Sequence, residues 1–411
     1  MASQPTPDPA SLNQTSTPIE HLDELPKIIE RVGVIGGGQL AWMMAGAADK
    51  LGIKLFIQTP QQSDPAVSIA AETVFAQIDD AAATAQLASC CDVITFENEF
   101  INLPALMQLA EDGICFRPRL EALLPLLDKY DQRCYFEKIG IPQPHFITLE
   151  GEINNQESIK AALNLSKLEF PCVLKARRHG YDGQGTFIIK NKDNLQAVWQ
   201  KLNYAPVLLE EFIAFERELA VVAARSATGE VVVYPVVETQ QEEQVCRRVF
   251  VPAEVSLNVA EEIKAIAHTL LHNLQVVGVF GIELFLTKTG KVLVNEVSPR
   301  THNSGHYTLD ACATSQFEQQ LRAVSNLPLG SSTLNCAGAV MVNLLGYESS
   351  QSDYLEKRQQ LASLPGAFVH WYNKTQSRPG RKLGHVTVRL DTQQASEANS
   401  KAQAIEAIWY G

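Results

Sequence analysis

Two carboxylates on neighbouring apolar segments are the residues best suited to chemistry. Glu283 lies in Gly-Ile-Glu-Leu-Phe and Glu296 lies in Val-Leu-Val-Asn-Glu-Val, with a turn signal at 287–291 between them. Like charges that face each other on paired strands are destabilising, and more so when they are partly buried. A Mg²⁺ ion removes this repulsion, because it takes a few carboxylate oxygens and leaves its other positions to phosphates. The hairpin therefore predicts a magnesium site at Glu283 and Glu296, although one glutamate pointing to solvent would also explain the pattern.

The length of the turn decides which oxygen atoms meet. A two-residue turn at Thr289 and Gly290 places Glu283 opposite Glu296, whereas a three-residue bulged turn places Asn295 opposite Glu283. Both alternatives bring carboxylate or amide oxygens together on a sheet otherwise made of Ile, Leu, Val and Phe.

A glycine-rich loop follows an apolar segment that ends in a lysine. Lys175 closes Val-Leu-Lys, and Gly180-Tyr-Asp-Gly-Gln-Gly185 begins five residues later. Closely spaced glycines let backbone N–H groups approach phosphate oxygens, and a nearby lysine adds positive charge. The loop lacks Gly-Lys-Ser/Thr, so it is not a Walker A loop. It suits a flap over a nucleotide, although a plain hairpin turn fits the same glycines.

Further acidic residues follow in the next apolar segment. Glu210 and Glu211 lie in Val-Leu-Leu-Glu-Glu-Phe-Ile, and Glu218 follows in Phe-Glu-Arg-Glu-Leu. Adenine can be bound by backbone amides of an extended segment, and a ribose by a carboxylate that accepts hydrogen bonds from its hydroxyls. Glu218 is the candidate for the ribose, and surface charge on a strand edge is the simpler alternative.

Polar residues and cations follow the acidic strand and recur near the C-terminus. Arg300, His302 and Asn303 follow directly after the strand that carries Glu296, so they emerge at the predicted metal site. Arginine can bind an anion such as a carboxylate through two parallel hydrogen bonds, and the other two side chains could orient an amine. A second basic cluster suits a sugar phosphate, because an acidic chain otherwise has little reason for it: Lys374, Arg378, Arg381 and Lys382. A polar loop and a solvated basic turn remain the alternatives.

The segment Gly36-Gly-Gly38-Gln-Leu-Ala fits the G-x-G-x-x-A pattern of a dinucleotide site. Such a site also needs an acidic residue at the end of the second strand. This chain has Phe-Ile-Gln58-Thr-Pro there, so NAD binding and a Rossmann oxidoreductase are disfavoured.

Strands that alternate with helices at the N-terminus indicate a parallel sheet, followed by more strand-rich regions. We expect a flexible extension at 1–30, a parallel-sheet domain at 31–118, a lid region at 119–208, a central domain at 209–330 and a small β-rich domain at 331–411. The expected helices are 40–51, 80–89, 119–140, 260–275 and 308–325. The expected strands are 31–35, 53–57, 92–96, 172–175, 186–190, 207–212, 217–225, 230–237, 279–286, 291–297, 339–345 and 386–390.

The composition limits the class of protein. A chain of 411 residues suggests two to four packed units, and a net charge of −12 argues against nucleic-acid binding. We expect a soluble cytoplasmic protein, because no apolar stretch is long enough to cross a bilayer and the N-terminus has no signal sequence. The eight cysteines include no CxxC pair, which favours free thiols in a reducing compartment.

Taken in order, these features resemble the nucleotide site of ATP-grasp enzymes. The chain is more closely similar to the family of 5-(carboxyamino)imidazole ribonucleotide synthetases over about residues 31 to 390. Four motifs carry this resemblance: Phe-Glu-Asn-Glu at 96–99, Gly-Tyr-Asp-Gly at 180–183, Asn-Glu-Val-Ser-Pro-Arg-Thr-His-Asn-Ser-Gly-His at 295–306 and Arg-Pro-Gly-Arg-Lys-Leu-Gly-His at 378–385. The resemblance implies an α/β and α+β ATP-grasp fold with a Rossmann-like N-terminal domain, a flap subdomain, a central mixed sheet and a β-rich C-terminal domain.

The resemblance also implies roles for individual residues. The ATP-binding residues would be Lys129, Lys175, Gly180, Gly183, Gln184, Gly185, Glu210, Glu211, Ile213, Glu218, Asn295 and Glu296. The ribonucleotide would contact Gly38, Gln39, Leu40, Glu97, Tyr181, Asp182, Asn303, Lys374 and Arg381. Catalysis would involve Arg300, His302 and Asp182, and Glu283 with Glu296 would hold Mg²⁺. Lys129 stands where the family often has arginine, and Gln184 where it usually has arginine or lysine.

The implied reaction is the ATP-dependent carboxylation of aminoimidazole ribonucleotide with bicarbonate, by a homodimer. ATP would phosphorylate bicarbonate, and the amine of the ribonucleotide would capture the carboxyl group. Asp182 and His302 are both candidates for the general base. Three rivals are a formate-dependent glycinamide ribonucleotide transformylase, an NAD oxidoreductase and a catalytically dead nucleotide-binding subunit.

Overall fold

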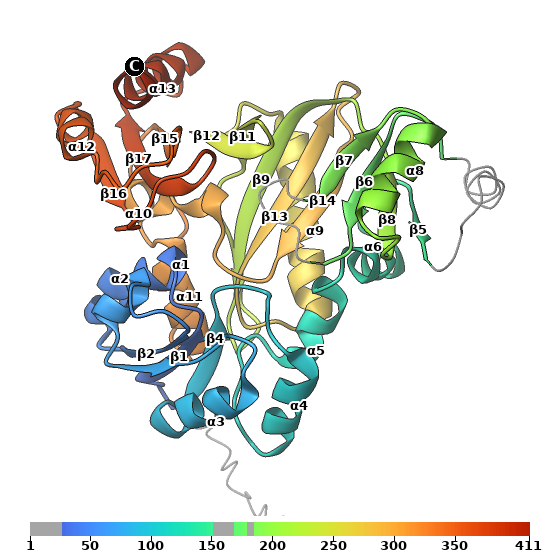
Figure 1. Cartoon of the computed structure of the whole chain (residues 1–411). Coiled ribbons are helices and arrows are strands. Elements are labelled where there is room, and N and C mark those ends of the chain that lie inside the picture. Colours follow the sequence, from blue (N-terminus) through green and yellow to red (C-terminus); the bar gives the residue numbers. More distant parts are fainter. Residues whose placement is uncertain (1–26, 151–167, 179–184) are drawn as a thin grey trace, which may run out of the picture.

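The computed structural model describes residues 27–150, 168–178 and 185–411 (Figure 1). The expected N-terminal extension therefore lies almost wholly outside the described residues. Within the described ranges, no helix combines the length and the apolar character needed to cross a bilayer.

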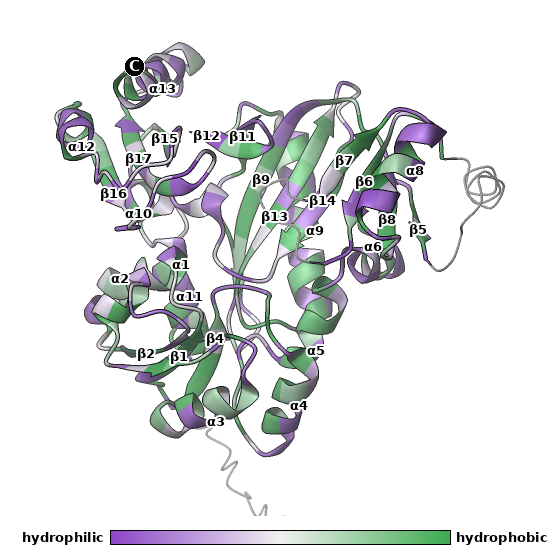
Figure 2. Ribbon diagram, in the orientation of Figure 1, coloured by the Kyte–Doolittle hydropathy of each residue, from purple (hydrophilic) through white to green (hydrophobic). Residues whose placement is uncertain are grey.

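The N-terminal sheet is parallel, with strand order β3-β2-β1-β4. Hydrophobic residues are concentrated on β1, β2 and β4 (Figure 2), as is typical of parallel strands covered by helices on both faces. The elements are β1 Arg31–Ile35, α1 Gln39–Trp42, α2 Ala45–Leu51, β2 Lys54–Thr59, β3 Glu72–Phe75, α3 Ala81–Cys90, β4 Val93–Phe96 and α4 Leu103–Glu111.

A four-stranded antiparallel sheet of order β5-β8-β6-β7 forms the expected flap region. Its inner face packs on α8, with Trp199 fully buried between them. The short α5 and the longer α6 connect the N-terminal sheet to this unit. The bounds are α5 Leu120–Leu123, α6 Lys129–Lys138, β5 Phe146–Leu149, β6 Cys172–Ala176, β7 Thr186–Ile189, α8 Lys192–Lys201 and β8 Val207–Glu211.

A nine-stranded sheet runs through the rest of the chain in the order β14-β13-β9-β11-β12-β15-β17-β16, with β10 on β9. Helix α9 packs on the β9–β13–β14 end, whereas α12 and α13 pack on the β15–β17 end. The strands are β9 Phe215–Arg225, β10 Val231–Val233, β11 Val237–Glu242, β12 Val245–Val251, β13 Gly278–Thr287, β14 Val292–Ser298, β15 Gly338–Leu345, β16 Ala367–Trp371 and β17 Lys382–Leu390. The helices are α9 Leu257–Leu274, α10 Thr308–Ala311, α11 Gln316–Val324, α12 Leu355–Ala362 and α13 Ala395–Tyr410.

Most of the helices and strands expected from the sequence are present, but four of them are divided. The helix expected at 119–140 is α5 and α6, with a short 3-10 turn between them. The helix expected at 40–51 is α1 and α2, the helix at 308–325 is α10 and α11, and the strand at 230–237 is β10 and the start of β11. Eight further elements were not expected from the sequence: β3, β5, β12, β16, α4, α8, α12 and α13. The domain boundaries remain a prediction.

Candidate active site

A cleft of about 2130 Å³ is lined by residues from the N-terminal sheet, the flap sheet and both ends of the nine-stranded sheet. The loop after β1 contributes Gly38 to Leu40, β6 and β8 contribute Lys175 and Glu210, and β13 and β14 contribute the two predicted metal ligands. Most of the described residues that the sequence analysis singled out therefore line one cavity, although they come from distant parts of the chain.

Glu283 and Glu296 are directly paired residues of β13 and β14, which is the pairing expected from a two-residue turn. The turn itself follows the other alternative. The turn has three residues, because the N–H of Thr287 bonds to the carbonyl of Lys291 at 2.9 Å. An irregularity at Asn295 then restores the pairing, because this residue has no partner on β13.

A lysine and a histidine lie beside the two carboxylates. Lys129 Nζ lies 2.5 Å from Glu296, and His302 Nε2 lies 3.3 Å from Glu283. Desolvation raises the pKa of Glu283, but the hydrogen bond and charge of His302 and the nearby lysines outweigh it and lower the pKa to about 2. Asn295 adds an amide oxygen, and its Nδ2 donates to Glu283 at 3.3 Å. Carboxylate and amide oxygens of this kind fit a Mg²⁺ ion bound together with phosphates.

Lys175 is buried at the end of β6 and is held by Glu210 of β8. Its Nζ lies 2.7 Å from Glu210 and donates to Asn295 Oδ1 at 2.9 Å. Desolvation raises the pKa of Glu210, yet the charges of Arg133 and Lys175 lower it to about 2. Sequence reasoning missed Arg133, whose Nε donates to Glu210 at 2.5 Å from a position 77 residues earlier. The only sequence feature that pointed to Arg133 was its position inside an expected helix.

Glu218 lies on β9 beside Glu283, and the two acids share the cleft. Burial first, and then the charge of Glu283, raise the pKa of Glu218 to about 7. A carboxyl group that is still partly protonated near neutral pH can accept or donate a hydrogen bond, which suits a ribose hydroxyl.

The pKa of Glu218 predicts how the stability of the ligand-free protein depends on pH. From pH 4.5 to 7 the folded chain retains a proton that the unfolded chain loses, so stability falls as pH rises through this window. We expect Glu218→Gln to remove about 1–2 kcal/mol of this fall, a value discounted for partial exposure. Urea unfolding at about pH 5 and about pH 8 measures it. If the free energy of unfolding of Glu218→Gln changes with pH as steeply as that of the wild type, the raised pKa of Glu218 is contradicted. Glu216→Gln on the exposed part of β9 is the control.

At the opposite end of the cleft, Glu97 organises the loop after β1. It accepts hydrogen bonds from the backbone N–H of Gly38 at 2.5 Å and of Leu40 at 3.0 Å. A Cβ on Gly38 would collide with the carboxylate of Glu97, so this glycine is required for the approach of the carboxylate. Lys374 donates to Gln39 at 2.6 Å, which brings the C-terminal basic cluster to the same loop.

Arg300 forms an ion pair with Glu99 at 2.8 Å inside the cleft. Burial lowers the pKa of its guanidinium, but the charge of Glu99 outweighs this and raises it. Asn303 donates a hydrogen bond from its Nδ2 to Asn343 at 3.0 Å, and Arg381 also lines the cleft. Glu211 and Ile213 also line the cleft, and Gly185 has a φ of 79° at the end of the flap loop. The remaining predicted residues lie outside the described ranges: Gly180, Tyr181, Asp182, Gly183 and Gln184.

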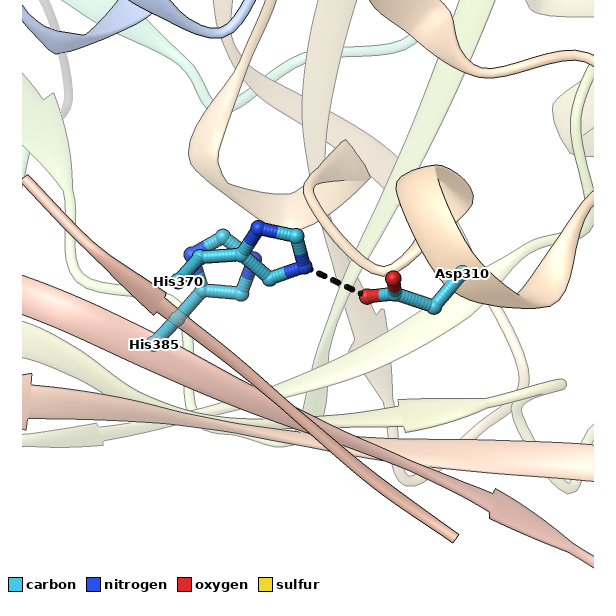
Figure 3. Close-up of side chains that lie close together, drawn as sticks. All are labelled: Asp310, His370 and His385. Carbon is cyan, nitrogen blue, oxygen red and sulfur yellow. Dashed lines mark hydrogen bonds and ion pairs between the residues drawn. The ribbon is translucent and has the colours of Figure 1, made fainter. Parts of the chain in front are cut away.

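A second group of potential metal ligands lies where α10 meets β16 and β17 (Figure 3). His370 Nε2 bonds to Asp310 at 2.9 Å, and His385 is the residue directly opposite His370 on β17. The two imidazole rings stack with centroids 4.5 Å apart and planes 14° from parallel. A metal ion lies in the plane of each imidazole that binds it, so rings stacked in this way cannot both direct a lone pair at one ion. We interpret the group as a contact that joins α10 to the C-terminal strands.

Comparison with known proteins agrees with this arrangement. Three families match in order: the ribonucleotide synthetase preATP-grasp domain at 29–124, the ATP-grasp domain at 134–317 and the phosphoribosylaminoimidazole carboxylase C-terminal domain at 339–399. The N5-carboxyaminoimidazole ribonucleotide synthase of Synechococcus elongatus is 54% identical over 93% of this chain and 96% of its own length. The chain belongs to the N5-carboxyaminoimidazole ribonucleotide synthase family. It is an ATP-grasp ligase, and the expected fold class is confirmed.

Solved structures in the N5-carboxyaminoimidazole ribonucleotide synthase family have the same fold. The enzyme from Aspergillus clavatus in complex with ATP is 32% identical, with a TM-score of 0.85 over 93% of this chain and 98% of that one. The Aspergillus clavatus enzyme in complex with ADP and 5-aminoimidazole ribonucleotide is 31% identical, with a TM-score of 0.83 over 92% and 98%.

Proposed function

We propose that this chain carboxylates 5-aminoimidazole ribonucleotide (AIR) with bicarbonate in an ATP-dependent step of purine biosynthesis, giving N5-carboxyaminoimidazole ribonucleotide, ADP and phosphate. The observation that carries the proposal is the facing pair Glu283 and Glu296 beside Lys175, in the cleft that also holds Glu97 and Lys374. Relatives named for this activity, and one bound to ADP and AIR, support it.

At the nucleotide end, each side chain has a role that its chemistry supports. Lys175 and the loop to Gly185 would bind the phosphates. Glu211 at the end of β8 and Ile213 just after it would border adenine, and Glu218 would accept hydrogen bonds from the ribose hydroxyls. Lys129 would contact the nucleotide and, without it, neutralises Glu296. A Mg²⁺ ion bound by Glu283, Glu296 and Asn295 would neutralise charge on the phosphates during transfer to bicarbonate.

At the acceptor end, Lys374 and Arg381 would bind the phosphate of AIR, and Gly38 to Leu40 with Glu97 would contact the rest of the ribonucleotide. Arg300 would stabilise the carboxylate that forms, by the bidentate geometry that arginine offers. Asn303 would help to orient the amine. His302 and Asp182 are both candidates for the general base, and His302 is already directed at Glu283.

The test is ADP release by the purified protein with each substrate omitted in turn. We expect release to require ATP, AIR and bicarbonate together, and to stop when formate with glycinamide ribonucleotide replaces bicarbonate with AIR. ADP release that ignores both AIR and bicarbonate would overturn the proposal. Formate-dependent activity would instead favour the transformylase, and saturable NAD binding would favour an oxidoreductase.

The resemblance also leads us to propose a homodimer in the cytoplasm. The eight cysteines are free thiols, in keeping with a reducing compartment. Sedimentation of the purified protein tests the dimer.

A further inference from the structure

Strand β14 contains one residue more than β13 at their pairing, namely Asn295, and this extra residue decides on which face of the sheet Glu296 lies. The strands pair without interruption up to Val294, Asn295 has no partner on β13, and Glu296 then pairs with Glu283. If Asn295 paired with Glu283 in an unbroken register, Glu296 would instead pair with Ile282, whose side chain is fully buried in the apolar core beneath the sheet. Paired residues point to the same face, so a shift of one residue would turn Glu296 away from the cleft.

Helix α6 binds the outer edge of β14 at this point, and β14 is the edge strand of the sheet. Gln132 donates to the carbonyl of Val297 at 3.1 Å and accepts from its N–H at 3.0 Å. Arg133 donates to the carbonyl of Val294 at 2.9 Å and to that of Asn295 at 2.7 Å. The guanidinium therefore binds the carbonyl of the extra residue and the carbonyl that precedes it.

The same guanidinium also reaches the nucleotide side of the cleft. Its Nε donates to Glu210, which accepts from Lys175, and Lys175 donates to the side chain of Asn295. Arg133 and Glu210 are each 2% exposed, so this closed set of charges is held away from water. Only arginine offers donors in a planar fork that can meet a carboxylate and two carbonyls together.

We propose that Arg133 is a positioning residue for the metal and triphosphate end of the cleft. It fixes the extra residue of β14, which keeps Glu296 beside Glu283, and it orients Lys175 through Glu210. The inference rests on the proposed function for the identity of the ligands, and it assigns Arg133 no contact with ATP or AIR.

The experiment compares full-length Arg133→Met and Arg133→Lys with the wild type. Calorimetry measures binding of a non-hydrolysable ATP analogue with and without Mg²⁺, and binding of AIR. We expect Arg133→Met to lower the Mg²⁺-dependent gain in analogue affinity by about 10- to 100-fold, the range seen when a group that orients a metal ligand is removed. AIR affinity should change by less than about twofold. Arg133→Lys should lie between, because it keeps the charge but not the fork.

A matched control is Arg225→Met. Arg225 is also buried in the nine-stranded sheet, and it donates to the carbonyl of Val276 at 3.0 Å and to Gln275 at 2.9 Å, away from the cleft. We expect this variant to lose thermal stability and to keep the wild-type Mg²⁺ dependence. The inference is overturned if folded Arg133→Met binds the analogue with wild-type Mg²⁺ dependence. If Arg133→Met does not fold, the same result with Arg133→Lys overturns it. If the wild type binds the ATP analogue with Mg²⁺ but releases no ADP with AIR and bicarbonate, the proposed function is wrong. The comparison of the Arg133 variants then still tests the positioning role of Arg133.

Discussion

Replacing Glu296 by glutamine is expected to lower AIR-dependent ADP release by about 10³-fold, the scale of effect that loss of charge stabilisation at a phosphoryl-transfer site produces. The change removes one of two facing carboxylates without altering side-chain volume, and it leaves Lys129 without its partner at 2.5 Å. Steady-state kinetics at saturating ATP across a Mg²⁺ titration measure it. The Mg²⁺ concentration needed for half-maximal rate should rise, because an amide oxygen is a weaker ligand than a carboxylate.

Glu283→Gln should behave in the same way, since its carboxylate is anionic with a pKa of about 2. Glu261→Gln removes a charge from the exposed face of α9 and should leave the kinetics unchanged. Wild-type rates and Mg²⁺ dependence in both Glu283→Gln and Glu296→Gln would exclude the pair as the metal site.

The second large effect is expected for Arg300→Met, which should lower kcat for carboxylation by about 10²- to 10³-fold, as when a donor to a developing anion is removed. Affinity for the ATP analogue should hardly change, because Arg300 lies toward the acceptor end, where Glu99 is its ion-pair partner at 2.8 Å. Rapid quench of ADP and of carboxylated product measures both halves of the reaction.

Arg300→Lys should recover part of the rate, because lysine restores the charge but cannot donate two parallel hydrogen bonds. Arg322→Met removes a partly buried arginine that pairs with Glu318 on α11, and it should leave kcat unchanged. A normal kcat in Arg300→Met, with product and ADP still formed together, would remove Arg300 from the chemistry.

The sequence was sufficient to place the two acidic strands together, because apolar segments around a glycine turn encode a hairpin locally. It was not sufficient to locate the extra residue at Asn295. The carbonyls at that irregularity are bound by Arg133, which is 161 and 162 residues away from them in the chain. Contacts over such separations leave no periodic signal along the chain.

Two of the expected elements that the structure divides contain a local sequence signal for the division. In the prediction, the longer apolar pattern outweighed this signal. Ser315 accepts from the N–H of Glu318 at the start of α11, and Ser-x-x-Glu is a capping pattern that marks a new helix within 308–325. Pro235 stands between β10 and β11 and cannot donate to a strand ladder. Residue roles in the flap loop have no such check, because 179–184 lie outside the described structure.

The nine-stranded sheet passes without a break from β12 to β15, although more than eighty residues separate these strands in the chain. Four backbone partners, from Arg248 with Val342 to Val251 with Ala339, join them. A chain shortened to end near residue 330 would keep every residue of the metal hairpin and yet present β12 as an unprotected sheet edge. The C-terminal segment thus serves as a cap against edge-to-edge aggregation of the catalytic half, as well as a source of cations for the cleft.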